Sequence, residues 1–183
     1  MSHRICLLRG VNVGGVKVLM TDLKTIASDA GFADPRTLLA SGNLVVQSDA
    51  APADIETALE EGITARYGRR IEVVVRTPPQ WTALMEANPY TDELAAEGAG
   101  SKLLVMVMKA GLRDGAVEAL RAFATDGEQV EAVTIDGGEA LYMWHPNGIG
   151  RSKMAEKALP RLIGIGTGRN WNTVVKLAEM VDA

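Results

Sequence analysis

The hydrophobic positions of residues 1–77 follow two spacings, one typical of strands and one typical of helices. Continuous or alternating apolar runs predict strands, and apolar residues three or four positions apart predict amphipathic helices. The predicted strands cover residues 3–8, 36–40, 43–47 and 71–76. The helical stripes are Leu23, Ile26, Ala27 and Ala30, then Ile55, Ala58, Leu59 and Ile63. This order, strand-helix-strand-strand-helix-strand, is the split βαβ pattern of a ferredoxin-like plait.

Residues 101–183 repeat this order without obvious sequence identity to the first half. The predicted strands cover residues 102–108, 128–135 and 140–144, with a short fourth strand within 162–167. Helices are predicted around 117–123, over 152–159 and after Asn170. We therefore predict an α+β protein of two ferredoxin-like (α-β plait) subdomains with mainly antiparallel sheets, plus a C-terminal helix.

The two plaits predict a division of the chain into three parts. Residues 1–77 form an N-terminal plait subdomain, residues 78–100 a helix and linker, and residues 101–183 a C-terminal plait-like subdomain with the terminal helix. The glycine-containing stretch at 95–100 is typical of a loop between subdomains.

Local signals predict where several helices begin and end. Thr21 is expected to cap the first helix and Asn170 the last, because short polar side chains bind the free N–H groups of a helix start. Gly68 is expected to end the second helix, since glycine adopts the left-handed conformation of a C-cap. Pro160 is expected to stop or kink the helix that starts at Ser152.

Composition excludes several classes of protein. Of the 183 residues, 47% are hydrophobic and 23% charged, which is the balance of a folded domain. The single cysteine, Cys6, forms no intrachain disulfide, and with two histidines the chain offers little for a metal site. The apolar runs are too short for a signal peptide or a membrane span. We expect a cytoplasmic protein without metal, cofactor or membrane association.

The charges are unevenly distributed along the chain. Residues 1–24 carry four basic residues against one acidic, and residues 145–183 carry six against three. The residues between them are strongly acidic, and the net charge is −4. If the two ends meet in space, they make a positive patch on an acidic protein, whereas separate ends leave only scattered solvated cations.

A glycine-rich loop at residues 9–17 is the first candidate for chemistry. It holds Arg9, Asn12, Lys17 and three glycines, and it leads from a strand into a helix. Glycines let backbone N–H groups converge on an anion, and a helix N-terminus adds positive potential. The spacing does not match a P-loop, because Val16 precedes Lys17 and no Ser or Thr follows. A structural turn without ligand is an equally good interpretation.

Two further blocks place cations beside predicted helix starts. The first, GIGRSK at 148–153, puts Arg151 and Lys153 beside Ser152, where cations oppose the helix dipole unless an anion is present. The second, at 167–176, puts Arg169, Asn170 and Asn172 at the start of the last helix. The alternative is ordinary capping with solvated cations.

Other residues favour structural roles. The Ser41-Gly42-Asn43 sequence is a hairpin turn signal, with a functional use of Ser41 or Asn43 as the minority interpretation. Cys6 lies in an apolar strand and is expected to be a buried hydrophobe. His145 is expected to be structural or on the surface, and no Ser-His-Asp set is evident.

Several blocks together resemble one known family. LRGVNVGG at 8–15, SGN at 41–43, VRT at 75–77, NPY at 88–90, GIGRSK at 148–153 and RNWNTVVKL at 169–177 occur in this order. The chain from about residue 4 to 180 resembles the bacterial family catalogued as domain of unknown function 1697. The resemblance implies two α-β plait subdomains and no established activity. Leu39 and Ala40 depart from the bulkier or amide-bearing pair usual before SGN.

Three functions are compatible with these blocks. Binding of an anionic ligand, whether a phosphate-bearing small molecule, a nucleotide or nucleic acid, ranks first and requires the cations to converge. An enzyme acting on a small phosphorylated or carboxylated substrate ranks second, since a general base is not evident. A homo-oligomeric interaction protein, such as a homodimer using a plait edge or sheet face, ranks third. The candidate ligand-binding residues are Arg9, Gly10, Asn12, Gly14, Gly15, Lys17, Ser41, Asn43, Arg151, Ser152, Lys153, Arg169, Asn170 and Asn172.

Overall fold

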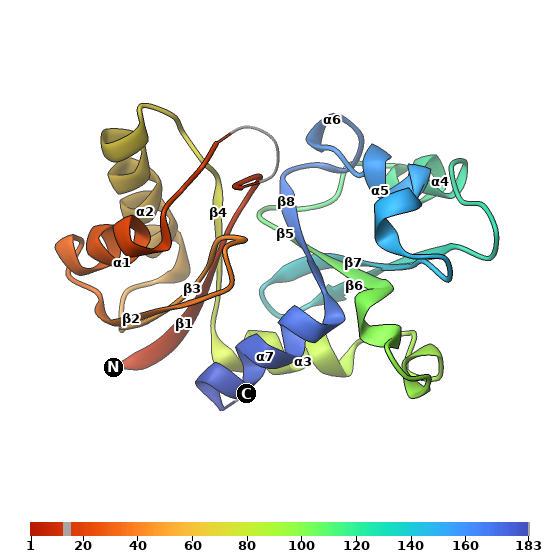
Figure 1. Cartoon of the computed structure of the whole chain (residues 1–183), viewed down its shortest axis with the longest axis horizontal. Coiled ribbons are helices and arrows are strands. Elements are labelled where there is room, and N and C mark those ends of the chain that lie inside the picture. The colour runs from red at the N-terminus through yellow and green to blue at the C-terminus, as the bar shows by residue number, and fades with distance from the viewer. Residues whose placement is uncertain (13–15, 183) are drawn as a thin grey trace. The chain divides into compact units, whose positions relative to one another are not determined.

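The computed structural model describes residues 1–12 and 16–182 (Figure 1). The strands are β1 (Ser2–Leu8), β2 (Ala33–Leu38), β3 (Asn43–Ser48), β4 (Val73–Arg76), β5 (Leu103–Met108), β6 (Gln129–Ile135), β7 (Gly138–Trp144) and β8 (Gly166–Asn170). The α-helices are α1 (Met20–Asp29), α2 (Pro52–Tyr67), α3 (Pro78–Glu86), α4 (Ala116–Arg121), α5 (Lys153–Lys157), α6 (Pro160–Ile163) and α7 (Trp171–Val181). Short 3₁₀ turns lie at Glu93–Ala95, Ala99–Ser101 and Ile149–Arg151.

The chain divides into two compact units. The first unit consists of Met1–Trp81 and Leu177–Ala183, and the second of Thr82–Lys176. Each contains one four-stranded antiparallel sheet, in the order β2-β3-β1-β4 in the first unit and β6-β7-β5-β8 in the second. In both, the first strand of the unit lies between its third and fourth. This order confirms the prediction of two plait-like sheets in an α+β protein.

The core of the first unit lies between its sheet and two helices. Figure 1 shows α1 and α2 on the same face of this sheet. Leu23 and Ile26 of α1, with Leu59 and Ile63 of α2, pack against strand residues that include Cys6. Gly62 permits close approach of the helices, because a Cβ there would lie 2.5 Å from Ile26 Cγ2. The predicted helical stripes are therefore buried, except that Ala58 is partly exposed and Ala30 is exposed at the end of α1.

The core of the second unit is rich in methionine. Met106 and Met108 of β5 pack with Met154 of α5, and with residues of α4 and α6. Gly166 and Gly168 of β8 leave room for the side chains of the two β5 methionines. A Cβ on either glycine would come within 2.7 Å of a methionine sulfur. Methionine fills such irregular space because its side chain is flexible and unbranched.

Both faces of each central strand are buried. In β1, Cys6 and Leu8 face the helices, while Ile5 and Leu7 point to the opposite face, and all four side chains are fully buried. The run Leu103–Met108 behaves in the same way, with only Leu104 partly exposed. This explains why the strands read as continuous apolar runs rather than as the alternation of a one-sided antiparallel sheet.

The last segment before α7 differs from the prediction. The predicted fourth strand is present but lies further along the chain, because Leu162 and Ile163 end helix α6 and β8 begins at Gly166. Pro160 does interrupt the predicted helix, but it also starts α6, where its missing N–H has no helical partner to lose.

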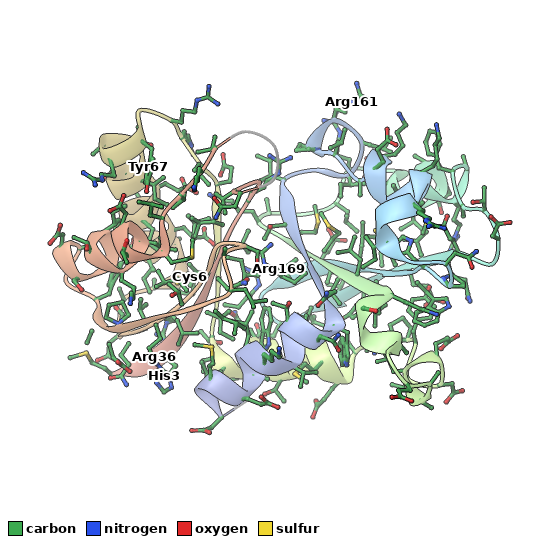
Figure 2. The ribbon with its side chains drawn as sticks, viewed as in Figure 1. His3, Cys6, Arg36, Tyr67, Arg161 and Arg169 are labelled. Carbon is green, nitrogen blue, oxygen red and sulfur yellow. The ribbon has the colours of Figure 1, made fainter. Side chains whose placement is uncertain are left out.

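The C-terminal residues of α7 belong to the first unit. The Arg36 guanidinium on β2 donates from Nη2 to the Met180 carbonyl oxygen at 3.0 Å. The same nitrogen lies 3.3 Å from His3 Nε2, and Figure 2 shows the two side chains together. Arginine suits a helix C-terminus, where free carbonyl groups carry partial negative charge. No helix within residues 1–12 and 16–182 combines the length and hydrophobicity needed to cross a membrane.

Candidate functional site

The candidate residues are distributed over both units. Arg9, Gly10, Asn12, Lys17, Ser41 and Asn43 belong to the first unit, and Arg151, Ser152, Lys153, Arg169, Asn170 and Asn172 to the second. Gly14 and Gly15 lie outside the described residues. Within the described residues, no group of three His, Cys, Asp or Glu side chains could hold a metal ion.

The segment after β1 turns back on itself. Arg9 donates its backbone N–H to the Glu72 carbonyl at 2.9 Å, and Gly10 has a positive φ of 66°. Asn12 then donates its backbone N–H to the Val16 carbonyl at 2.8 Å. Backbone bonds therefore hold both described ends of the glycine-rich loop.

The Asn12 side chain fastens this segment to two neighbours. Its Nδ2 donates to the carbonyl oxygens of Val18, at 3.2 Å, and of Ala40. Its Oδ1 accepts the Val18 N–H at 3.0 Å. Asn12 also has a positive φ of 57°, a conformation that asparagine tolerates better than most residues. The described contacts of this amide are thus structural.

The Ser41-Gly42-Asn43 block forms the β2–β3 turn, as predicted. Asn43 is fully buried, and its Nδ2 donates to the Leu38 carbonyl and to Ser41 Oγ, both at 2.9 Å. Gly42 lies against β1: a Cβ there would sit 2.6 Å from Val11 Cγ2 and 2.8 Å from Leu8 Cβ. The LRGVNVGG and SGN blocks therefore pack against each other.

A cavity of about 420 Å³ opens beside these two blocks. Its lining residues are Asn12, Val16, Lys17, Val18, Leu19, Met20 and Ala40. Lys17 is the charged residue among them, and it is exposed, as is half of Leu19. The cavity thus has a largely apolar lining with a cation at its rim, which suits an amphipathic anion.

The start of α1 differs from the prediction. Thr21 is not the cap, because the N-cap is Leu19 and Thr21 lies inside the helix. The Leu19 N–H donates to Tyr67 Oη at 3.0 Å, and Tyr67 Oη donates to Asp22 at 2.7 Å. Hydrogen bonds from Tyr67 and then Arg66 lower the pKa of Asp22. A carboxylate of this protein therefore already occupies the first turn of α1, which favours negative charge.

The GIGRSK block contains a comparable internal anion. Ser152 caps α5, with its Oγ accepting the Ala155 N–H at 3.0 Å, and it also hydrogen-bonds the carboxylate of Glu128. Lys153 begins α5, whereas Arg151 lies in the preceding 3₁₀ turn, and both are exposed. Arg151 and Lys153 therefore lie beside a helix start whose cap, Ser152, is hydrogen-bonded to the Glu128 carboxylate of the same unit.

Glu128 also holds the only histidine of the second unit. His145 Nδ1 lies 3.1 Å from Glu128 Oε1, and the Thr125 N–H donates to Glu128 Oε2 at 3.1 Å. Burial raises the pKa of Glu128, but the hydrogen bonds from Ser152, His145 and Thr125 together hold it below its ordinary value. Because Ser152 and His145 both bind Glu128, this arrangement differs from a triad in which the histidine lies between carboxylate and serine.

His145 is fully buried. Of the two predicted alternatives, a structural or a surface position, the structure has the buried one. Burial lowers the pKa of His145, and the Glu128 carboxylate only partly restores it. The unfolded chain therefore binds a proton more readily than the folded chain. The imidazole contributes nothing to stability well above its ordinary value of 6.5, and it destabilises the fold progressively as pH falls below that value.

We predict a measurable loss of stability between pH 7.5 and 5.0 that depends on His145. The slope reaches at most about 1.4 kcal/mol per pH unit, the limit for one proton. Glu128 contributes little in this window, because its ordinary pKa of 4.5 is already below it. Urea unfolding at several pH values measures the slope, which should flatten in His145→Gln. A slope that His145→Gln leaves unchanged contradicts the prediction.

Arg169 lies in β8 and not in the first turn of a helix. Only 7% of this residue is exposed, and its Nη1 donates to Thr167 Oγ1 at 2.7 Å and to the Gly168 carbonyl at 2.8 Å (Figure 2). Burial lowers the pKa of Arg169 to about 10, so the guanidinium stays charged at neutral pH. Both of these hydrogen bonds are with its own strand.

Arg76 occupies the equivalent position in the first unit. Each arginine lies on the fourth strand of its sheet, opposite Ile5 or Val105 of the first strand. Arg76 is also buried, and its Nη1 donates to the Val75 carbonyl at 2.8 Å. Arg76 of the VRT block and Arg169 are thus buried arginines at equivalent positions of the edge strands in the two units.

The residue after each arginine caps the next helix. Asn170 Oδ1 accepts the Thr173 N–H at 3.0 Å at the start of α7, which confirms the predicted cap. Thr77 Oγ1 accepts the Gln80 N–H at 3.3 Å at the start of α3, and Gln80 Oε1 accepts the Thr77 N–H in return. Asn172 is exposed in the first turn of α7 and lies against Gly100, where a Cβ would meet its Oδ1.

Two groups of interacting residues were not found by sequence reasoning. Glu128 has no motif around it, and only the fold brings it to His145, 17 residues away. Tyr67 and Asp22 are 45 residues apart, and the one available signal was an acidic residue near a helix start. Cys6, in contrast, is buried as expected, and burial raises the pKa of its thiol, which disfavours the nucleophilic thiolate.

Comparison with known proteins identifies a family and a fold. The family model described as "Protein of unknown function (DUF1697)" matches residues 1–139. No curated protein matches the chain. The solved structure of the conserved bacterial protein SP0830 from Streptococcus pneumoniae is similar with a TM-score of 0.75 and 19% identity, over 100% of this chain and 99% of that one. At this identity the structural likeness concerns the fold alone.

Proposed function

The chain belongs to the family of proteins of unknown function designated DUF1697, and we propose that it binds a small anionic ligand in its first unit. The binding site is the cavity between residues 16–20, Asn12 and the β2–β3 turn. The observation that carries the proposal is that Asn12 of the LRGVNVGG block and Ala40, directly before the SGN block, line one cavity with the Lys17 cation at its rim.

The chemistry of the lining indicates the class of ligand. Lys17 supplies a positive charge, while Val16, Leu19 and Met20 supply apolar surface. A molecule with one phosphate or carboxylate and an apolar or aromatic body fits both features. A volume of about 420 Å³ suits a nucleotide or another phosphorylated metabolite better than a nucleic-acid strand. The net charge of −4 also disfavours a bulk polyanion.

The anion is held by Lys17 and not by the start of α1. Asp22 lies in the first turn of that helix and is kept ionised by Tyr67 and Arg66. The Leu19 N–H already donates to Tyr67. Binding therefore depends on one charge-assisted interaction, which contributes about 1.5–3 kcal/mol.

We expect Lys17→Ala to weaken ligand binding by about 10- to 100-fold, which is the affinity equivalent of that interaction. The ligand class is first found by thermal shift with nucleotides, sugar phosphates, inorganic phosphate, short RNA and DNA, and uncharged controls. A ligand that binds only the folded protein raises its melting temperature. Isothermal titration then compares the wild type with the variant.

The matched control is Lys24→Ala, an exposed lysine on α1 outside the cavity lining. This variant should bind as the wild type does. Equal weakening by both substitutions, or a shift shared by all polyanions and abolished by salt, would mean nonspecific attraction and contradict the proposed site.

A further inference from the structure

The outer strands of the two sheets differ in how their free edges are protected. The sheet orders leave β2, β4, β6 and β8 with one unpaired side each. An unpaired edge presents free backbone N–H and C=O groups to any other extended chain, and proteins usually blunt such edges.

Side chains cover β4. The Val73 and Val75 N–H groups donate to the carboxylates of Glu60 and Glu56, at 3.0 and 2.9 Å. The Val75 carbonyl accepts from Arg76. Two N–H groups and one carbonyl on the edge of β4 are therefore bonded by side chains of the first unit itself.

The edges of β2 and β8 are blunted in other ways. The pairing of β2 with β3 shifts register between Ala33 and Arg36, where Asp34 has a positive φ of 46° and Pro35 has no N–H to donate. Strand β8 has only five residues, and its Gly168 carbonyl accepts from Arg169. Neither strand offers a long regular ladder.

Strand β6 is covered at one end only, near Val130, and is otherwise regular. Its seven residues pair with β7 in unbroken register from Gln129 opposite Trp144 to Ile135 opposite Gly138. A two-residue turn closes this hairpin, so Ile135 and Gly138 exchange both hydrogen bonds, and alternate residues of β6 bond to β7 from there. The backbone groups of Val130, Ala132 and Thr134 consequently point away from the sheet.

One contact supports this orientation. Arg121 Nη2 donates to the Val130 carbonyl oxygen at 3.4 Å from the open side of β6. Ala132 and Thr134 are exposed, and within residues 1–12 and 16–182 their outward backbone groups have no hydrogen-bond partner. A hollow of about 400 Å³ between α4 and this edge reaches Ala132.

We propose that β6 is an interface, and that its partner is β6 of a second copy of this chain. An antiparallel pair centred on Ala132 sets Ala132 opposite its own copy and Val130 opposite the second copy's Thr134. The Val130 carbonyl accepts a second hydrogen bond in this arrangement, since it has two lone pairs.

The self-pairing is electrostatically acceptable. Glu131 faces the second copy's Val133, so the two glutamates are never directly opposite, whereas like charges in that position destabilise a ladder. The two-fold symmetry makes the contact isologous and closed. One dimer uses the free β6 edge of both copies. The β6-β7-β5-β8 sheet of one copy and the same sheet of the second copy join into one continuous antiparallel sheet.

Sedimentation velocity of the full chain tests the proposal. The wild type should sediment as a dimer of 19.5 kDa protomers that dissociates on dilution. Ala132→Pro removes an outward N–H that β7 does not use, so we expect a folded protein whose dimer dissociation constant rises at least about tenfold. Ala132→Ser keeps the N–H and is the matched control that should still dimerise.

A second variant guards against misfolding of the proline variant. Ala132→Lys sets two lysines opposite each other at the two-fold axis and should weaken the dimer through like-charge repulsion, while circular dichroism stays unchanged. Two results overturn the proposal: a wild type that is monomeric at its highest soluble concentration, or a dimer that both variants leave intact. The second result would assign the dimer to another surface.

Discussion

Replacing Gly42 by alanine should destabilise the protein by about 2–4 kcal/mol, because two penalties act together. The residue has a φ of +79°, a conformation unfavourable for any residue with a Cβ. The added methyl group would also meet Val11 Cγ2 at 2.6 Å and Leu8 Cβ at 2.8 Å. Both neighbours are buried, so neither can move without disturbing the core.

Gly31→Ala is the matched control for this substitution. Gly31 has a similar φ of +86°, but a Cβ there would find nothing within 4 Å. Only the conformational penalty, about 1 kcal/mol, is then expected. Equilibrium urea unfolding followed by circular dichroism measures both variants. If the two substitutions destabilise the protein equally, the turn does not press on β1 and the account of the SGN block is wrong.

Replacing Asn12 by alanine should have an effect of similar size, about 2–4 kcal/mol. Its side-chain amide bonds both the N–H and the C=O of Val18, and Val18 is almost completely buried. Buried backbone groups that lose their partners each cost about 1–3 kcal/mol. The bond to the Ala40 carbonyl is lost as well, and with it the link to the β2–β3 turn.

Asn12→Gly separates the hydrogen bonds from the backbone conformation. Glycine accepts the φ of 57° but makes no side-chain bond, so it should lose the contacts without the conformational penalty. We expect alanine to be the more destabilising of the two, and hydrogen exchange at the Val18 N–H to accelerate in both. Unchanged protection of the Val18 N–H in either variant would show that Asn12 does not hold this segment.

Both substitutions also bear on the proposed ligand site. Asn12 and Ala40 line the cavity, and Gly42 positions the turn that carries Ala40. Their loss should therefore weaken binding through the shape of the cavity, whereas Lys17→Ala should weaken binding and leave the unfolding free energy near that of the wild type. Comparing the loss of binding affinity with the loss of unfolding free energy distinguishes residues that shape the cavity from Lys17, which contacts the anion.

Secondary structure could be predicted wherever side chains carried a local signal. The apolar runs of β1 and β5 and the Asn170 cap are examples, because each depends on neighbours within a few residues. The bounds of β8 were predicted wrongly, because Gly164, Gly166 and Gly168 leave no alternation of apolar and polar side chains in this segment. There the strand is defined by antiparallel pairing with β5, in which Gly168 lies opposite Met106 and Gly166 opposite Met108, residues distant in the sequence. Prediction also failed at Thr21, where Tyr67 from another helix serves the start of α1.

The candidate site could be predicted only as a set of residue types. Glycines and cations near helix starts are typical of anion sites, and the sequence contains three such blocks. It does not show that the carboxylate of Asp22 already lies in the first turn of α1, or that Glu128 binds Ser152 at the start of α5. It also does not show that the Arg169 guanidinium is buried against its own strand.

The sequence by itself therefore determined the two plaits, their hairpins, the Asn170 cap and the Gly68 helix end, because these follow from side-chain periodicity and turn chemistry over short distances. Only the tertiary structure decided which polar groups are already engaged, since their partners come from segments far apart in the chain. Asn12 and Asn43 hold backbone, Ser152 holds a carboxylate and a helix start, and Lys17 remains at the rim of a cavity. Tertiary structure likewise decided which strand edge is most open. The edge of β4 is covered and those of β2 and β8 are interrupted or short, whereas β6 is regular and exposes Ala132 and Thr134 beyond the Arg121 contact at Val130.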